Sequence, residues 1–290
     1  MSTLNVIDVS QYNGTVDWSS VEADGAIIRC GIRGWGSAGT LQQDTKFSAN
    51  AAAAAAAGVP FGLYFVTQAT STAEAEEEAD YCLQLASGLE LTFPIYLDIE
   101  AAGGADGNGR ADGLTKAART KYAAAFCTAI EAAGYTAGVY ANLNWWKNCL
   151  NAADLADWSC WCASTGTSTA PDPGITLDAW QYTFTGSDPG VTGSVDRSYF
   201  YRDFITERIE SKVAALTQEE FDEFAENWWT RKRQSLQALE GSDWSEEART
   251  WAETNGIYVG GTSGFMWQDL QTREQTAQVL QRLAAKLGLE

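Results

Sequence analysis

The stretch Phe93-Pro-Ile-Tyr-Leu-Asp-Ile-Glu100 is a short apolar run that ends in two carboxylates one residue apart. Its residue types favour a buried β-strand, in which residues i and i+2 point to the same face about 6.5 Å apart. Asp98 and Glu100 would therefore share one face of a sheet. Repulsion and burial raise the pKa of one of two acids held this close, which supplies the proton donor and the charged partner that glycoside cleavage requires. The alternative is a strand end with two solvated acids.

The composition indicates a folded protein with an acidic surface. The 290 residues include 12 Trp, 11 Tyr and 11 Phe, and 45% of them are hydrophobic. This is enough to form the core of one large domain with a small appendage, or of two medium domains. Because the formal net charge is −19, we do not expect nucleic acid as a partner. No stretch approaches the 18 consecutive apolar residues that indicate a membrane span, so we do not expect a membrane partner either.

Histidine is absent from the sequence. Its absence excludes Ser-His-Asp and Cys-His catalysis and removes the commonest metal ligand, so acid-base chemistry must fall to carboxylates. The six cysteines lie at irregular spacings without a Cys-x-x-Cys pair, and we interpret them as mostly buried thiols. We therefore expect no metal and no cofactor.

The segment Asp106-Gly-Asn-Gly-Arg-Ala-Asp-Gly113 alternates oxygen donors in the manner of a calcium loop. It fails the detailed template, because Ala111 and Ala117 occupy the positions of the required glycine and of the bidentate glutamate. We interpret the segment instead as a flexible loop that lies over the cleft where a lid would belong.

Strand candidates alternate with connections over residues 1–205, and some connections are long enough for helices. The eight expected strands are Asn5–Ser10, Ala26–Gly31, Phe61–Thr67, Phe93–Ile99, Thr136–Ala141, Ser159–Ala163, Leu177–Tyr182 and Gly193–Asp196. The expected helices are Gln43–Ala57, Thr72–Ala86, Leu114–Ala133 and Leu143–Asn148. This alternation predicts an α/β fold with a mostly parallel sheet, closed as an irregular (β/α)8-type barrel with reduced helices. An open doubly wound sheet is the alternative, but no glycine-rich phosphate loop follows any strand.

Polar residues follow the ends of these strands, where barrel enzymes carry their chemistry. The acids from the first, fourth and eighth strands would form a strongly acidic pocket, and they are Asp8, Asp98, Glu100 and Asp196. The candidate substrate-binding residues are Tyr64, Tyr140, Asn142, Trp180, Gln181 and Tyr182. Aromatic rings suit the apolar faces of sugars, although a single tryptophan is more often a core residue.

Several motifs fall in order at these strand ends. They are Asp8-Val-Ser-Gln-Tyr-Asn-Gly14 followed by Asp17-Trp18, Tyr96-Leu-Asp-Ile-Glu100, Gly138-Val-Tyr-Ala-Asn142, Trp180-Gln-Tyr182 and Val195-Asp196. Over about residues 4–205 they resemble, in order and spacing, the glycoside hydrolase family 25 lysozymes. The resemblance implies a barrel that cleaves the β-1,4 bond from N-acetylmuramic acid to N-acetylglucosamine in bacterial peptidoglycan.

The same resemblance implies roles for the four acids. Glu100 would be the general acid, Asp98 its partner carboxylate, and Asp8 and Asp196 the other acids of the site. The chain departs from the family pattern at Phe65, because many members carry a histidine after the tyrosine that Tyr64 matches. We therefore expect the wall of the site near Tyr64 to differ in its substrate contacts.

The expected mechanism retains the anomeric configuration. Glu100 would protonate the glycosidic oxygen while the 2-acetamido oxygen of the substrate attacks the anomeric carbon, and Asp98 would orient and polarise the acetamido N–H. We favour substrate assistance because two acids on one strand and one face are poorly placed to act from opposite sides of a bond. The alternatives are direct attack by Asp98 and inversion through a water molecule held by Asp8 or Asp196.

The sequence becomes helical after Phe204, over Glu207–Leu216 and Gln218–Leu239, with an apolar stripe along the second segment. Within residues 241–290, the segments Ala248–Ile257 and Thr272–Leu283 resemble an S-layer homology module. We therefore divide the chain into a catalytic barrel (1–205), a helical linker (206–240) and a module for cell-wall binding or oligomerisation (241–290). Such a module would bind a secondary cell-wall polymer and raise the local enzyme concentration. The alternative is a helical appendage that packs on the barrel or pairs with a second copy, giving a homo-oligomer.

The sequence begins almost directly with a strand and lacks the regions of a secretory signal peptide. A muramidase without a leader, joined to a wall-binding candidate, has the layout of a bacteriophage endolysin. We therefore expect synthesis in the host cytoplasm and action on the bacterial cell wall, ending in bacteriolysis. The competing hypotheses are a chitinase-like carboxylate-pair glycosidase, a non-catalytic cell-wall-binding barrel and a structural wall protein.

Overall fold

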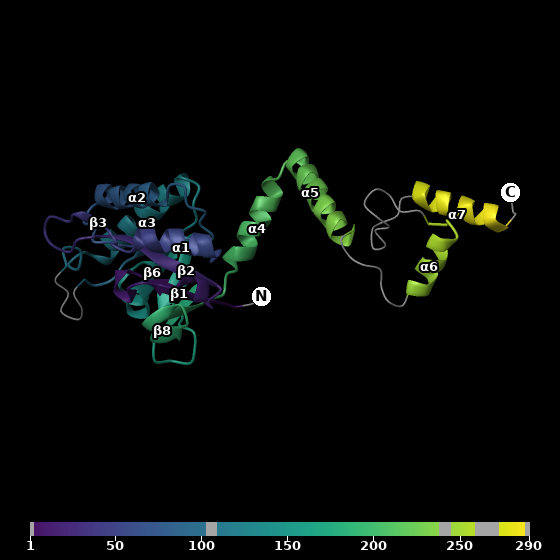
Figure 1. Cartoon of the computed structure of the whole chain (residues 1–290). Helices are drawn as coiled ribbons and strands as arrows, with labels where there is room; N and C mark the ends of the chain where they lie inside the picture. The colour runs from purple at the N-terminus through teal and green to yellow at the C-terminus, as the bar shows by residue number, and fades with distance from the viewer. Residues whose placement is uncertain (1–2, 103–108, 238–244, 259–272, 288–290) are drawn as a thin grey trace. The chain divides into compact units, whose positions relative to one another are not determined.

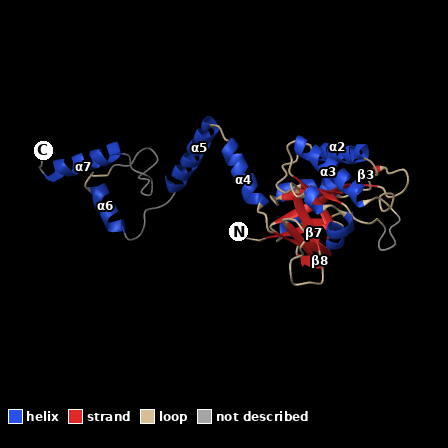
Figure 2. Cartoon of the chain, turned by 180° about the vertical axis from the view of Figure 1, so that it is seen from behind, coloured by secondary structure: helices blue, strands red, loops and turns tan. Residues whose placement is uncertain are grey.

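The computed structural model describes residues 3–102, 109–237, 245–258 and 273–287. The chain divides into two compact units, Met1–Ser211 and Lys212–Glu290, which are described separately. Figure 1 labels their helices and strands, and Figure 2 shows the same elements from behind. Among the described residues, no helix combines the length and the apolar character needed to cross a membrane.

The first unit is a closed barrel of eight strands. They are β1 (Leu4–Val9), β2 (Gly25–Arg33), β4 (Phe61–Val66), β5 (Ile95–Asp98), β6 (Ala137–Asn142), β7 (Ser159–Ala163), β8 (Ala179–Asp188) and β9 (Val191–Phe200). The barrel closes because β1 pairs with both β2 and β9. All eight predicted strands are therefore confirmed. The short strand β3 (Leu41–Gln43), which pairs with β2 outside this ring, was not predicted.

The last strand of the barrel differs from the other seven in direction. β9 runs antiparallel to both of its neighbours, β8 and β1, whereas the remaining barrel pairs are parallel. The expected position of Asp196 at a C-terminal strand end is therefore wrong. Asp196 lies inside β9, directly opposite Asp8 of β1. The antiparallel register brings this acid to the C-terminal rim of the barrel.

Helices cover the outside of the barrel, as Figure 1 shows. They are α1 (Phe47–Ala57), α2 (Thr72–Ala86) and α3 (Lys116–Ala132), with short 3-10 helices at Gln11–Asn13, Trp18–Ser20 and Ala152–Leu155 and a π-helical turn at Trp145–Cys149. The side chains of Ser71 and Thr115 cap the N-termini of α2 and α3 by accepting backbone N–H bonds. Gly58 ends α1 in the left-handed conformation, with φ of 72°. The predicted helix Gln43–Ala57 begins later than expected, because β3 and a turn occupy its first residues.

Strand alternation separates two apolar layers. The outer layer, which includes Ile7, Ile28, Leu63, Phe65 and Val139, packs against the helices. It also holds all five of the buried free cysteines. The inner layer fills the barrel with large side chains, including Val6, Ile27, Tyr96, Trp161 and Phe200.

A glycine makes room for one ring of this inner layer. A Cβ atom at Gly138 would overlap the Tyr96 ring, so β6 needs glycine at this position. The Tyr96 hydroxyl lies 2.9 Å from the Ser159 hydroxyl, and the Trp161 indole N–H donates to the Ser198 hydroxyl at 3.0 Å. The lower barrel is therefore a packed, largely aromatic floor whose polar groups bond to one another.

Helix α4 (Phe204–Ala215) begins in the first unit and ends in the second. The second unit continues with α5 (Gln218–Gln237), α6 (Glu246–Thr254) and α7 (Arg273–Leu287). The two helices expected after Phe204 thus correspond to α4 and α5. Helix α6 overlaps the segment Ala248–Ile257 and α7 overlaps the segment Thr272–Leu283, but the connection 259–272 lies outside the described residues. The S-layer-homology module and the division into 1–205, 206–240 and 241–290 stay predictions.

Candidate active site

A cavity of about 410 Å³ opens at the C-terminal ends of the parallel strands, above the aromatic floor. All four predicted acids line it: Asp8, Asp98, Glu100 and Asp196. Three of the six predicted substrate-binding residues line it as well, namely Tyr64, Tyr140 and Gln181. Segments that are far apart in the sequence therefore meet at one acidic rim.

Gln181 links the acids of two strands to an aromatic side chain. Its Nε2 atom donates to Asp8 Oδ2 at 2.8 Å and to Asp196 Oδ2 at 3.4 Å. Its Oε1 atom accepts a hydrogen bond of 2.7 Å from the Tyr140 hydroxyl. One amide thus bridges two acids that face each other across the β1–β9 pair, and it fixes the Tyr140 hydroxyl beside them.

The four carboxyl groups all resist ionisation. Burial, followed by repulsion from Asp196, raises the pKa of both Asp8 and Glu100. Burial, followed by repulsion from Glu100 and Asp8, raises the pKa of Asp98 well above its ordinary value. Burial raises the pKa of Asp196 to about 6. The cluster therefore titrates as a coupled set that retains protons above the usual carboxylate range.

Asp98 combines deep burial with an unused acceptor. Its side chain is 6% exposed, and its Oδ1 atom has no hydrogen-bond partner among the described residues. A buried acceptor without a donor is costly. Because Asp98 lines the cavity, a ligand N–H or O–H placed there would satisfy this atom.

Arg29 is a cavity residue that the sequence analysis missed. Its Nε atom lies 2.7 Å from Asp44 Oδ2, and its guanidinium carbon lies 5.0 Å from the centre of the Tyr12 ring. Its positive charge opposes the rise in the pKa of Asp98. Arg29 could have been identified from the sequence, because it is a basic residue within the apolar strand β2. It lies two residues from the inward-facing Ile27 and therefore on the same face of the strand.

Other cavity residues were also missed as site residues. They are Gln11, Tyr12, Ile32, Arg33, Trp35, Gln42, Gln43, Asp44, Thr45, Val66, Gln68, Ala101, Ala102 and Trp161. Most of them come from loops and from β3, which carry no strand periodicity. Tyr12 and Trp35 are 78% and 57% exposed, so their rings are available to stack on an apolar sugar face.

Three predicted substrate-binding residues do not line the cavity. The Asn142 side chain accepts the backbone N–H of Trp145 at 3.0 Å, and the Trp180 indole N–H donates to the Ser164 carbonyl at 2.7 Å. The Tyr182 ring stacks on Tyr199 with centroids 4.3 Å apart. Gln181 faces inward, so its neighbours on β8 must face the other way. The three residues thus have structural contacts, and no substrate contact follows from their positions.

The expected difference at the wall near Tyr64 is not supported by the position of Phe65. Phe65 is fully buried in the outer layer, where its ring meets Tyr81 edge-on at 6.3 Å. Tyr64 and Val66 line the cavity and Phe65 does not. Adjacent strand residues point to opposite faces, so the absent histidine does not alter this wall directly.

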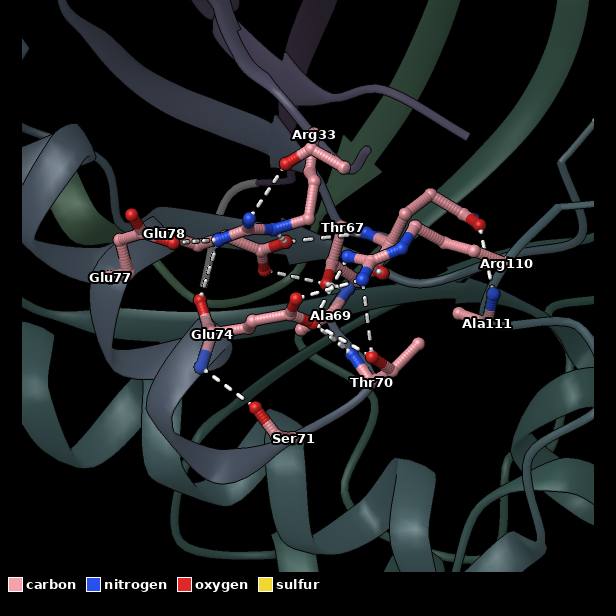
Figure 3. A network of polar contacts seen from close by, with 12 residues as sticks. Arg33, Thr67, Ala69, Thr70, Ser71, Glu74, Glu77, Glu78, Arg110 and Ala111 are labelled. Carbon is pink, nitrogen blue, oxygen red and sulfur yellow. Dashed lines mark hydrogen bonds and ion pairs between the residues drawn. The ribbon is translucent and has the colours of Figure 1, made fainter. Parts of the chain in front are cut away.

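Figure 3 shows a polar network that joins Arg33, Thr67 and the helix α2. Arg33 Nε contacts Glu78 at 2.8 Å, and its Nη2 atom contacts Glu77 at 2.7 Å. Glu78 also accepts from the Thr67 hydroxyl at 2.6 Å and from the Gln68 amide at 3.3 Å. Burial raises the pKa of Glu78 to about 7, although Thr67 and Arg33 favour its ionised form. The network ties α2 to the end of β4, where the Gln68 side chain reaches the cavity.

The same network extends to the loop after β5. Arg110 contacts Glu74 Oε1 at 2.8 Å, and the Gln68 side chain accepts the Ala111 N–H at 3.2 Å. Asp112 accepts backbone N–H bonds from Ala102 and Gly109. The remainder of the Asp106–Gly113 segment, residues 106–108, lies outside the described residues. Within the described part of the chain, no three acidic or cysteine side chains are placed to share a metal ion.

This arrangement can perform acid catalysis on a neutral, sugar-like substrate. It offers buried carboxyl groups with raised pKa values, a buried carboxylate oxygen without a donor among the described residues, and exposed aromatic rings at the cavity edge. These are the parts that a glycosidase with two working carboxyl groups needs.

Comparisons with known proteins also indicate a glycosidase. The chain is 30% identical over 205 residues to Lysozyme M1 of Streptomyces globisporus, a match that covers 67% of this chain and 66% of that protein. The modular autolysin LytC from Streptococcus pneumoniae, solved with a synthetic peptidoglycan ligand, is 27% identical with a TM-score of 0.60 over 69% of this chain and 47% of the autolysin. The CTP1L endolysin is 25% identical with a TM-score of 0.57, over 72% of this chain and 70% of the endolysin.

The chain therefore spans about two thirds of the curated lysozyme and about half of the autolysin. The family model described as "Glycosyl hydrolases family 25" matches residues 7–191, which include Asp8, Asp98 and Glu100 of the cavity. The eight-stranded barrel and its acidic rim agree with this match. The chain belongs to glycosyl hydrolase family 25.

Proposed function

We propose that this protein is a lysozyme that cleaves the β-1,4 bond from N-acetylmuramic acid to N-acetylglucosamine in peptidoglycan. The observation that carries the proposal is the single cavity lined by Asp8, Asp98, Glu100 and Asp196 in a chain of this family. The names of its relatives, a lysozyme and an autolysin with a peptidoglycan ligand, support the substrate class.

Glu100 is the proposed general acid. It is less enclosed than Asp98, and its pKa is raised, so a proton remains on it where an exposed glutamate would be ionised. Asp98 is the proposed acceptor for the acetamido N–H of the substrate, which would satisfy the unpartnered Oδ1 atom. The positive charge of Arg29 and this N–H both favour ionised Asp98, and ionised Asp98 in turn favours the protonated form of Glu100.

The acetamido oxygen would then attack the anomeric carbon as Glu100 protonates the leaving oxygen, and water would open the resulting oxazolinium ion with retained configuration. NMR of the first-formed product tests this step. We expect the β-anomer of the new reducing end to appear first and to mutarotate later. Initial release of the α-anomer would show inversion and would exclude this mechanism.

The bond that is cleaved is tested by digesting purified peptidoglycan and reducing the products with borohydride before mass spectrometry. We expect N-acetylmuramitol at the new ends. N-acetylglucosaminitol would show a glucosaminidase instead. Comparable rates on soluble chitin oligomers and on peptidoglycan would favour the chitinase-like alternative.

A phage origin and a wall-binding tail are further parts of the proposal. The CTP1L endolysin is among the similar structures, and the segments that resemble an S-layer homology module lie in the second unit. A pull-down of the full chain on cell walls, before and after extraction of secondary polymers with hydrofluoric acid, tests the tail. Loss of binding after extraction is expected, and unchanged binding would contradict a secondary-polymer ligand.

A further inference from the structure

Helix α5 carries a row of exposed aromatic side chains. Phe221, Phe224, Trp228 and Trp229 are 54%, 61%, 51% and 50% exposed. At positions i, i+3, i+7 and i+8 they lie on one face of the helix, with Ala225 between them. Contiguous apolar surface of this kind marks an interaction site.

The charges of α5 are divided along its length. The first half contains Glu219, Glu220, Asp222, Glu223 and Glu226, and the second half contains Arg231, Lys232 and Arg233. This division also suits the helix dipole. The dipole, however, does not determine on which face of the helix each charge lies. The charged residues also follow a pattern around the helix axis.

An interval of 11 residues, which is about three helical turns, separates Glu220 from Arg231, and the same interval separates Asp222 from Arg233. Each acid therefore shares one flank of the aromatic stripe with its base. The interval also relates Phe221 to Lys232, which both lie within the stripe. All three pairs have their midpoints between residues 225 and 228, close to the centre of the aromatic row.

We propose that α5 pairs antiparallel with α5 of a second copy of this chain, about a two-fold axis at the level of Glu226 and Asn227. In this arrangement, residues on the same flank of the two helices face each other. Glu220 then lies beside the partner's Arg231, and Asp222 beside the partner's Arg233. Phe221 lies under the aliphatic stem of the partner's Lys232. A parallel pair would instead place acid beside acid and base beside base.

The pairing buries both aromatic rows against each other, which supplies the driving force, while the flank charges select the antiparallel direction. The dimer would join two catalytic barrels through their second units. Two linked copies bind one insoluble polymer more tightly than either copy alone.

Sedimentation equilibrium of the full chain tests the proposal. We expect a reversible dimer, and we expect Phe224→Asp with Trp228→Asp to weaken it at least about tenfold, since buried aromatic residues dominate such interfaces. A full chain that stays monomeric at all accessible concentrations would overturn the proposal. So would a monomer in which Trp228→Asp lowers the stability of the barrel, because the stripe would then be covered by its own chain.

Charge reversal tests the direction of the pairing. Glu220→Lys with Asp222→Lys should weaken self-association about tenfold, and so should Arg231→Glu with Arg233→Glu. An equimolar mixture of the two variants should form a heterodimer.

The matched control, Glu219→Lys with Glu223→Lys, makes the same change in charge on the opposite face of α5 and should dimerise normally. Far-UV circular dichroism checks that each variant keeps its helix. Folded variants that fail to associate when mixed, or a control that dissociates equally, would exclude the antiparallel pair.

Discussion

Burial, followed by repulsion from Asp196, raises the pKa of Glu100, and both carboxyl groups line the same cavity. A general acid must be protonated, so activity is lost as pH rises through the pKa of Glu100. Replacing Asp196 with Asn removes the repulsion and lowers this pKa. We therefore expect Asp196→Asn to shift the alkaline limb of the kcat/KM profile to lower pH.

Asp157→Asn is the matched control, because Asp157 is an exposed acid that does not line the cavity. Its alkaline limb should coincide with that of the unmodified protein. If Asp196→Asn leaves the limb in place or moves it to higher pH, the proposed coupling between Asp196 and Glu100 is wrong.

Asp98 is expected to act through the acetamido group of the substrate. Asp98→Asn should reduce kcat about 10²- to 10³-fold, because the acceptor for the acetamido N–H loses its charge. The unmodified protein should lose a similar factor on peptidoglycan whose N-acetyl groups have been removed, and the variant should lose little more. If the unmodified protein cleaves the de-N-acetylated polymer rapidly and the Asp98→Asn variant does not, direct attack by Asp98 is indicated instead.

At the scale of single elements, the contacts of α2 with β2 separate buried from exposed ion pairs. Arg33 contacts Glu78 and Glu77 at almost equal distances, but the Glu78 side chain is fully buried and that of Glu77 is 59% exposed. Removing one partner of a buried pair leaves a dehydrated charge, at a cost of about 3 kcal/mol or more. An exposed pair contributes less than about 1 kcal/mol.

We therefore expect urea denaturation to show a large loss of stability for Glu78→Ala and a small one for Glu77→Ala, which serves as its control. Equal losses in the two variants would mean that burial does not determine the strength of these contacts. Because Gln68 N–H bonds to Glu78 and the Gln68 side chain borders the cavity, Glu78→Ala should also reduce activity at temperatures where it remains folded.

The strands could be predicted from the sequence because each is an apolar run with a polar residue at its end. The direction of β9 could not, since alternation gives the face of a residue but not the direction of its strand. Asp196 was therefore selected correctly as a rim residue but for the wrong reason. Trp180 and Tyr182 were predicted to lie in the site together with Gln181. Strand alternation, however, points Gln181 to one face and its two neighbours to the other, so the three cannot all face inward.

Arg29 and Asp44 were missed for a different reason. Their importance depends on the short strand β3 and the turn after it, which bring Asp44 to within 2.7 Å of Arg29. Such contacts between loops and strands leave no periodic trace in a sequence. Four acidic and three neutral residues of the cavity could be predicted from the sequence. The positively charged residues of the cavity could be recognised only from the structure.

At the scale of the whole molecule, the two units have separate tasks in this account. A chain that ends at Leu216 keeps α4, whose Phe204 packs against Phe93 and Phe200 of the barrel. We expect this truncated chain to unfold at the temperature of the barrel in the full protein. It should cleave short soluble peptidoglycan fragments at an unchanged rate and intact walls at least about tenfold more slowly, since it lacks the second binding unit.

A truncated chain that digests intact walls as fast as the full protein would contradict a role for the second unit in wall binding. A truncated chain that loses activity on soluble fragments would show that the second unit contributes to the barrel itself. The two substrates therefore distinguish tethering from structural support.

Glu100 is the proposed general acid, and the rate at which reducing ends appear in purified peptidoglycan tests this role. We predict that Glu100→Gln lowers this rate at least about 10³-fold, while Glu76→Gln, an exposed glutamate of α2 outside the cavity, leaves it unchanged. New N-acetylmuramic acid ends produced by Glu100→Gln at nearly the unmodified rate would contradict the account.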